Sequence, residues 1–141
     1  MKPNIPLRVR NLIKKHDTCD PYLIAKEMNI TILLAQTPSK VNGFWRRILR
    51  RKYICINEEL CEWQQKAVLC HELGHILLHP GYKNYCMAGR TYVVSQRHED
   101  EADIFALECF SHFSDLDRQY IDDFLKNGWK KQKTTKSRFY L

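Results

Sequence analysis

The sequence has no long hydrophobic run, and none of its apolar stretches approaches the ~20 residues that a membrane-spanning helix requires. Its N-terminal segment, MKPNIPLRVRNLIKK, lacks the apolar core of a secretory signal. No two of its six cysteines are spaced as Cys-x-x-Cys, and Cys55, Cys70 and Cys109 lie in apolar runs. These absences predict a cytoplasmic protein, without a membrane partner, whose thiols are free and mostly buried.

Internal repeats and interdomain linkers are absent too, so a length of 141 residues predicts one compact domain. We place this domain at residues 1–128 and expect residues 129–141 to form a basic, mobile tail. Lys and Arg number 23 against 16 Asp and Glu, which gives a net charge of +7. Because this excess lies in short clusters and accompanies no nucleic-acid-binding motif, it favours plain solubility over direct DNA binding.

The spacing of apolar side chains predicts an α+β fold in which a small antiparallel sheet packs against helices. Spacing of three to four residues predicts helices and β-branched stretches predict strands, while Asp20 and Pro21 mark a helix start. The expected helices are 5–16, 20–28, 59–79, 98–113 and 115–127, the last capped by Ser114, and the expected strands are 29–36, 44–49, 52–57 and 91–94. We expect the helix at 59–79 to be central.

The central helix carries HELGH at residues 71–75, with two histidines four residues apart. Residues at this spacing lie on one helix face, ~6 Å apart along the axis, so both imidazoles can reach one zinc ion. Glu72 is rotated by ~100° from His71 and can take a proton from water near the ion, as a general base. Gly74 indicates close packing by a neighbouring element. Two core histidines that hydrogen-bond within the fold are the alternative.

A zinc site of catalytic type requires a third protein ligand. Glu99 is favoured over Glu101, because it shares a helix face with small alanines that allow close approach to the motif helix. Asp103, one turn beyond Glu99, is expected to accept the free ring N–H of His71, with an exposed carboxylate as the alternative. His79 lies a further turn from the ion and is expected to hydrogen-bond within the fold. The candidate metal ligands that follow the motif in the sequence are His79, His98, Glu99, Asp100, Glu101 and Asp103.

Two parts of the sequence resemble known zinc metallopeptidases. HELGH, followed downstream by Glu99 and Asp103, is similar to the gluzincin arrangement. The longer segments HELGHILLHPG and EDEADIFA resemble more closely the ImmA/IrrE family of bacterial and phage metallopeptidases, over residues 20–110. The chain departs from that family at residues 107–113, LECFSHF, where the family has an apolar end of the type Leu-Leu-Met-Pro.

The resemblance implies that His71, His75 and Glu99 bind Zn²⁺ and that Glu72 is the catalytic base. It implies a zinc endopeptidase that cleaves a helix-turn-helix transcriptional repressor of a prophage, mobile element or stress response, and so lifts repression. The alternative is a non-catalytic, zinc-containing protein that sequesters a repressor or a toxin. Glu72 argues against this alternative, because a structural zinc site has no use for a base beside the metal.

Two further features bear on substrate binding. Tyr92 and His98, between the ligand helices, are candidate donors to the oxyanion that forms during peptide hydrolysis. The substrate peptide is expected to lie as an added strand beside residues 44–49. There, Arg46 and Arg47 favour acidic side chains in the peptide, although a solvated basic turn explains these arginines equally well.

Overall fold

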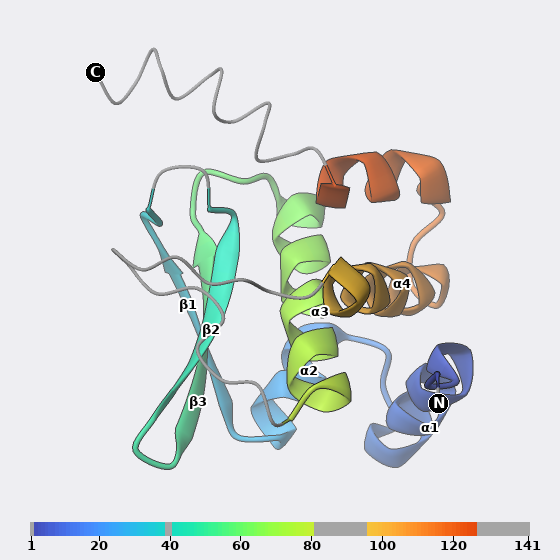
Figure 1. The fold of residues 1–141 in the computed structure, drawn as a ribbon, viewed down its shortest axis with the longest axis horizontal. Helices are drawn as coiled ribbons and strands as arrows, with labels where there is room; N and C mark the ends of the chain where they lie inside the picture. The colour runs from blue at the N-terminus through green and yellow to red at the C-terminus, as the bar shows by residue number, and fades with distance from the viewer. Residues whose placement is uncertain (1, 39–40, 81–95, 127–141) are drawn as a thin grey trace.

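The computed structural model describes residues 2–38, 41–80 and 96–126 of the chain. Its elements follow one another in the order α1 (Ile5–His16), α2 (Pro21–Glu27), β1 (Ile30–Ala35), β2 (Gly43–Ile48), β3 (Arg51–Asn57), α3 (Glu62–Leu78) and α4 (Gln96–Ser111). Residues 118–126 are also helical. Figure 1 shows the sheet on one side of α3 and α4 on the other. The predicted α+β class and the central place of the motif helix are therefore confirmed.

The first two helices begin and pack as their local sequence dictates. Asp20 Oδ1 accepts a hydrogen bond from the Tyr22 N–H (2.9 Å) ahead of α2, whose first residue is Pro21. This cap is the one that the sequence predicts. α1 is tied to the motif helix, because Arg8 Nη2 donates to the carbonyl oxygen of Leu77, in the last turn of α3, at 3.0 Å.

The sheet is mixed, with strand order β1-β3-β2, so the prediction of a wholly antiparallel sheet is wrong. β2 and β3 form the expected antiparallel hairpin, because only residues 49–50 connect them. β1 pairs with the other edge of β3 and runs parallel to it. Ala35 at the end of β1 pairs with Asn57, and Gly43 at the start of β2 pairs with Ile56. The connection from β1 to β2 therefore turns back over one end of β3, and β3 takes the place between them.

α3 is held closely on two sides. Towards α4, a Cβ atom added at Gly74 would lie 3.0 Å from Phe105 Cβ, which confirms the close packing predicted at this glycine. Towards the sheet, a Cβ atom added at Gly43 of β2 would collide with the Val68 side chain and lie 2.9 Å from the Cys55 carbonyl oxygen. The two glycines thus let the sheet and α4 approach the motif helix from either side.

The last described helix packs on the first half of α3. Trp63 lies 5.1 Å from Tyr120 and 5.2 Å from Phe124 between ring centroids. Asp117 caps this helix, since its Oδ1 accepts a backbone N–H two residues further on at 2.8 Å. The prediction of Ser114 as the cap is wrong, because its hydroxyl accepts an N–H in the turn before the helix. Buried apolar side chains from this helix and from α1 to α4 and β1 to β3 form one core cluster.

Several sequence predictions fall on other parts of the chain. The strand at 91–94 and the basic tail at 129–141 lie outside the described residues. All five cysteines within the described ranges are free thiols. No helix in the described ranges combines the length and the apolar character needed to cross a membrane.

Candidate metal centre

The two motif histidines lie one helical turn apart on α3 and face the same side. The centroids of the His71 and His75 rings are 4.8 Å apart. Their side chains are 13% and 2% exposed, respectively. The four-residue spacing therefore brings both imidazoles to one partly shielded place on the helix, as a helical repeat of 3.6 residues requires.

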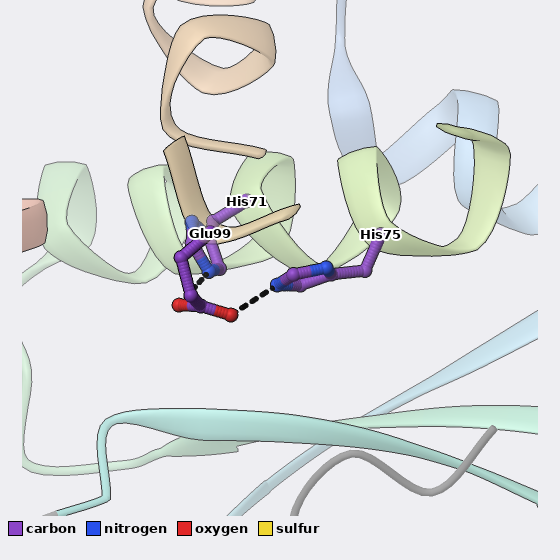
Figure 2. Close-up of side chains that lie close together, drawn as sticks. All are labelled: His71, His75 and Glu99. Atoms are coloured by element: carbon purple, nitrogen blue, oxygen red, sulfur yellow. Dashed lines mark ion pairs between the residues drawn. The ribbon is translucent and has the colours of Figure 1, made fainter. Parts of the chain in front are cut away.

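α4 supplies a carboxylate to the same place. Glu99 Oε1 lies 3.4 Å from His71 Nε2, and Glu99 Oε2 lies 2.8 Å from His75 Nε2. Figure 2 shows the three side chains converging from the two helices. Their ligand-type atoms all lie within 4.8 Å of one another, and no other group of this kind occurs in residues 2–38, 41–80 and 96–126. The structure thus brings together the three predicted ligands, whereas Glu101 faces a different partner.

Asp103 lies one turn beyond Glu99 on α4 and is buried, with a side chain that is 7% exposed. Its Oδ1 is 2.9 Å from His71 Nδ1, the ring nitrogen that is not turned to Glu99. The two atoms are close enough for an ion pair but are not aligned as a hydrogen bond, and neither has another partner in the described part of the chain. Burial excludes the alternative of an exposed carboxylate. Because an ionised carboxylate only accepts, this contact favours a proton on His71 Nδ1, and Nε2, which faces Glu99, is the nitrogen that a metal would bind.

His79 is outside the ligand group and hydrogen-bonds within the fold, as predicted. Its Nδ1 lies 3.3 Å from His75 Nδ1, and its Nε2 lies 2.8 Å from Glu101 Oε1. Arg97 Nε donates to Glu101 Oε2 at 3.3 Å. The His98 ring stacks on His79, with 3.9 Å between centroids. Sequence reasoning missed this role of Glu101, although a third histidine at the same four-residue spacing was a signal for it.

Glu72 is buried beside the histidines, with an exposed fraction of 6%. Burial raises the pKa of its carboxyl group to about 8. The positive charge of His71 opposes this rise, and the carboxylates of Glu99 and Asp103 add to it. A cation at the centre would act in the same direction as His71. It would therefore favour the ionised carboxylate, which is the form that a general base requires.

The charges and donor atoms of the three converging side chains fit a divalent cation. Burial lowers the pKa of His71, but Asp103 and Glu99 outweigh it and raise that pKa well above its ordinary value. Burial lowers the pKa of His75. Burial also raises the pKa of Glu99, yet hydrogen bonds from the two histidines outweigh it and hold that pKa far below its usual range. Two imidazole nitrogens and an ionised carboxylate are a donor set that zinc takes in catalytic sites.

Of the two candidate oxyanion donors, only His98 lies within the described residues. Tyr92 falls outside the described residues. His98 is described, and its ring packs face to face with His79. Both assignments stay predictions.

A peptidase family model, described as the IrrE N-terminal-like domain, matches residues 25–139 of the chain. The match reaches further towards the C terminus than residue 110, where the motif-based resemblance was expected to end. That limit was wrong, because it rested on short motifs around the histidines and glutamates, and these occur only in the middle of the chain. No solved structure matches the chain.

Two curated relatives are similar to the chain over most of its length. The "Uncharacterized immunity region protein 2" of Bacillus phage phi105 is 38% identical over 104 residues, which are 74% of this chain and 66% of that protein. The "Metallopeptidase ImmA" of Bacillus subtilis (strain 168) is 31% identical over 103 residues, which are 72% of this chain and 59% of that protein. The chain thus spans a little under two thirds of the length of these relatives.

Proposed function

The chain belongs to the peptidase family of the IrrE N-terminal-like domain, and from this premise we propose that it is a zinc-dependent endopeptidase. The observation that carries the proposal is the convergence of His71, His75 and Glu99, with the buried carboxyl group of Glu72 beside them. When bound, zinc supplies the Lewis acidity that polarises a peptide carbonyl group and makes water more acidic.

The side chains of the chain divide the work of such a reaction. His71, His75 and Glu99 would hold the metal, and Asp103 would keep the proton of His71 on Nδ1. Glu72 would take a proton from the attacking water and pass it to the leaving amine. Burial of Glu72 excludes competing water from this carboxylate, which strengthens its interaction with the proton that it moves.

We propose a helix-turn-helix transcriptional repressor as the substrate. Similarity to an immunity region protein of a phage supports a target that controls a phage or another mobile element. Similarity to a metallopeptidase supports proteolysis as the means of control. Cleavage would separate parts of the repressor that act together and would release its promoter.

The substrate segment is proposed to lie as an added strand beside β2, which is at the edge of the described sheet. In Figure 2 the strand ribbons lie on the side of α3 towards which the three ligand side chains point. Arg46 and Arg47 lie on β2, and the side chain of Arg47 is exposed. Two adjacent positive charges on the docking strand would favour acidic side chains in the peptide.

Charge reversal at Arg47 tests this preference. Arg47→Glu is expected to lower kcat/KM about 3- to 10-fold for a fluorogenic peptide with acidic residues near the scissile bond, because a screened attraction becomes a repulsion. The same change is expected to raise kcat/KM for a matched basic peptide. Arg50→Glu makes the same charge change in the turn after β2 and is the control. Equal effects of the two variants would show that overall charge, and not this strand, sets the preference.

Glu72→Gln separates a peptidase from a sequestering protein. The substitution keeps the size of the side chain and removes the base, so zinc content and repressor binding are expected to persist. Cleavage is expected to fall by ~10²- to 10⁴-fold, the usual loss for a general base. Each form would be incubated with a helix-turn-helix repressor encoded by a neighbouring gene, and cleavage would be measured on gels. Release of the promoter would be measured with a reporter gene.

His75→Ala is the companion variant, since it is expected to lose both the metal and the cleavage. The peptidase proposal fails if wild type and Glu72→Gln release the promoter equally and leave the repressor intact. Sequestration would then take its place.

A further inference from the structure

A row of side chains leads from His75 to the surface of α4. His75 Nδ1, the ring nitrogen not turned to Glu99, lies 3.3 Å from His79 Nδ1. His79 Nε2 lies 2.8 Å from Glu101 Oε1, and Arg97 Nε donates to Glu101 Oε2 at 3.3 Å. The side chains of His75, His79 and Glu101 are 2%, 4% and 12% exposed, so water competes little for the inner contacts.

If a metal took the place of the hydrogen bond between His75 Nε2 and Glu99, one arrangement of protons on neutral histidines would satisfy every contact in this row. Glu101 accepts from both Arg97 and His79, and an ionised carboxylate has no proton to give. His79 therefore donates from Nε2, which leaves its Nδ1 as an acceptor. His75 must then donate from Nδ1. The lone pair of His75 is then on Nε2, the nitrogen that donates to the Glu99 carboxylate when no metal is bound and that would bind the metal in its place.

We propose that His79 and Glu101 are positioning residues that hold His75 in the Nδ1–H tautomer and present its Nε2 to the metal. The inference rests on the proposed metal site and adds two residues to it. His71 meets its carboxylate directly, with 2.9 Å between Nδ1 and Asp103 Oδ1. At His75, Nδ1 meets His79 instead, and His79 connects it to the carboxylate of Glu101.

The backbone conformation and the packing at His79 indicate that contacts with neighbouring side chains fix the orientation of its ring. His79 is the C-cap residue of α3, with φ −129° and ψ 58°, so the regular helix no longer dictates where its side chain points. His98 stacks on the ring with 29° between the planes, which leaves the ring edges to the two hydrogen-bonding partners. Stacking on His98 and the contact with Glu101 thus fix the orientation of the His79 ring, which His75 contacts.

The competing explanation is that the contacts of His79 with His75 and Glu101 only hold the end of α3 against the start of α4. The two explanations differ in what they affect. Contacts that only hold the helices together stabilise the metal-free fold and do not change the metal affinity of the folded protein. A positioning role lowers that affinity when the row is broken, even in fully folded protein, because partners behind a metal ligand set its orientation and basicity.

The test measures Zn²⁺ affinity by competition with a chromophoric chelator, at a temperature at which every variant is folded. His79→Phe keeps a ring that can stack on His98 and removes both hydrogen bonds. It is expected to weaken zinc binding about 10- to 100-fold. Glu101→Gln keeps the shape and removes the charge, and its amide can donate to His79 as well as accept from it. We expect a smaller loss in the same direction, and this variant decides the matter if His79→Phe does not fold.

Asp100→Asn is the matched control, because it removes the same charge from an exposed neighbour on α4. It is expected to bind zinc like the wild type. A second measurement is the NMR signal of the His75 ring proton on Nδ1 in zinc-loaded protein. In the wild type this proton is hydrogen-bonded and buried, so it exchanges slowly and is observed far downfield. In His79→Phe the signal is expected to disappear while zinc is still bound.

Equal zinc affinity in His79→Phe, Glu101→Gln and Asp100→Asn would overturn the positioning role. If the variants show that the row raises zinc affinity but the wild type cleaves no repressor, the positioning role stands and the proposed peptidase activity fails. A wild type that binds no zinc would remove the metal site, and the positioning role with it.

Discussion

The two glutamates at the start of α4 are two residues apart and meet different histidines. Glu99 contacts His71 and His75, and Glu101 contacts His79. Residues at this spacing point ~200° apart around a helix, so one of the two had to turn away from the metal ligands. The small neighbours of Glu99 predicted which one from the sequence. The pairing of Glu101 with His79 could not be predicted, because it depends on how α4 crosses the end of α3, which spacing within one helix does not encode.

Replacement of each glutamate by alanine separates a metal ligand from a residue behind a ligand. Glu99→Ala is expected to weaken Zn²⁺ binding by more than the ~10- to 100-fold that is usual for outer partners, because a direct donor is lost. Glu101→Ala is expected to stay within that range. Both affinities would be measured by chelator competition on folded protein. Equal losses, or a larger loss for Glu101→Ala, would show that Glu99 is not the third ligand.

At the scale of elements, the sequence predicted the described helices and strands and the pairing of β2 with β3, but not the pairing of β1. β-branched residues at alternating positions indicate a strand whatever its neighbours are. The two-residue turn at 49–50 also specifies the antiparallel pairing of β2 with β3. Nothing local determines that β1 joins the far edge of β3. That choice depends on which order of strands covers α3 best, with Trp45, Ile54 and Ile56 buried against the helix side of the core.

Gly43→Ala tests the approach of β2 to α3. The added Cβ atom would meet the Val68 side chain and the Cys55 carbonyl oxygen. The backbone carbonyl cannot move without disturbing the β2–β3 pairing, so we expect a loss of about 1–3 kcal/mol in the free energy of unfolding, as for overpacked cores. Denaturant unfolding monitored by circular dichroism would measure it. Gly74→Ala is the comparison: the added Cβ atom would lie 3.0 Å from Cβ of the buried Phe105, so α3 and α4 need to separate only slightly, and alanine gains about 0.8–1 kcal/mol in helix propensity, so a smaller net loss is expected.

At the scale of the whole molecule, the fold and the metal centre depend on different interactions. The core cluster consists of apolar side chains from every labelled element and from the last described helix. The centre, in contrast, buries the polar side chains of Glu72, His75 and Asp103. Buried charges of this kind do not stabilise a fold without a compensating partner. Because the apolar core stabilises the fold, we expect the chain to fold without metal. The predicted domain boundary at residue 128 stays a prediction.

Metal is then expected to stabilise the fold by an amount that depends on pH. The folded pKa of His71 is raised, so its protonated ring contributes stability that is fully present below the unfolded pKa of about 6.5 and is lost as pH rises through the folded pKa. The pKa of Glu72 is raised to about 8, so stability is also lost between its unfolded pKa of about 4.3 and pH 8. Through these two groups a rise in pH weakens the metal-free fold, and the lowered pKa of His75 opposes this only up to its unfolded pKa of about 6.5. A rise in pH also strengthens metal binding, because a proton on His71 competes with the metal.

Thermal unfolding with zinc and with excess EDTA, at pH 6 and at pH 8, measures this coupling. Zinc at 100 times its Kd adds about 2.7 kcal/mol to the free energy of unfolding, and the added stability grows with the ratio of free metal to Kd. At one fixed zinc concentration, the difference in Tm between zinc and EDTA is expected to be larger at pH 8, because fewer protons compete for His71 and the ratio of free zinc to Kd is higher. His75→Ala is expected to show almost no difference at either pH. A wild-type difference that is equal at the two pH values would mean that protons and metal do not compete for His71, and that the metal binds elsewhere.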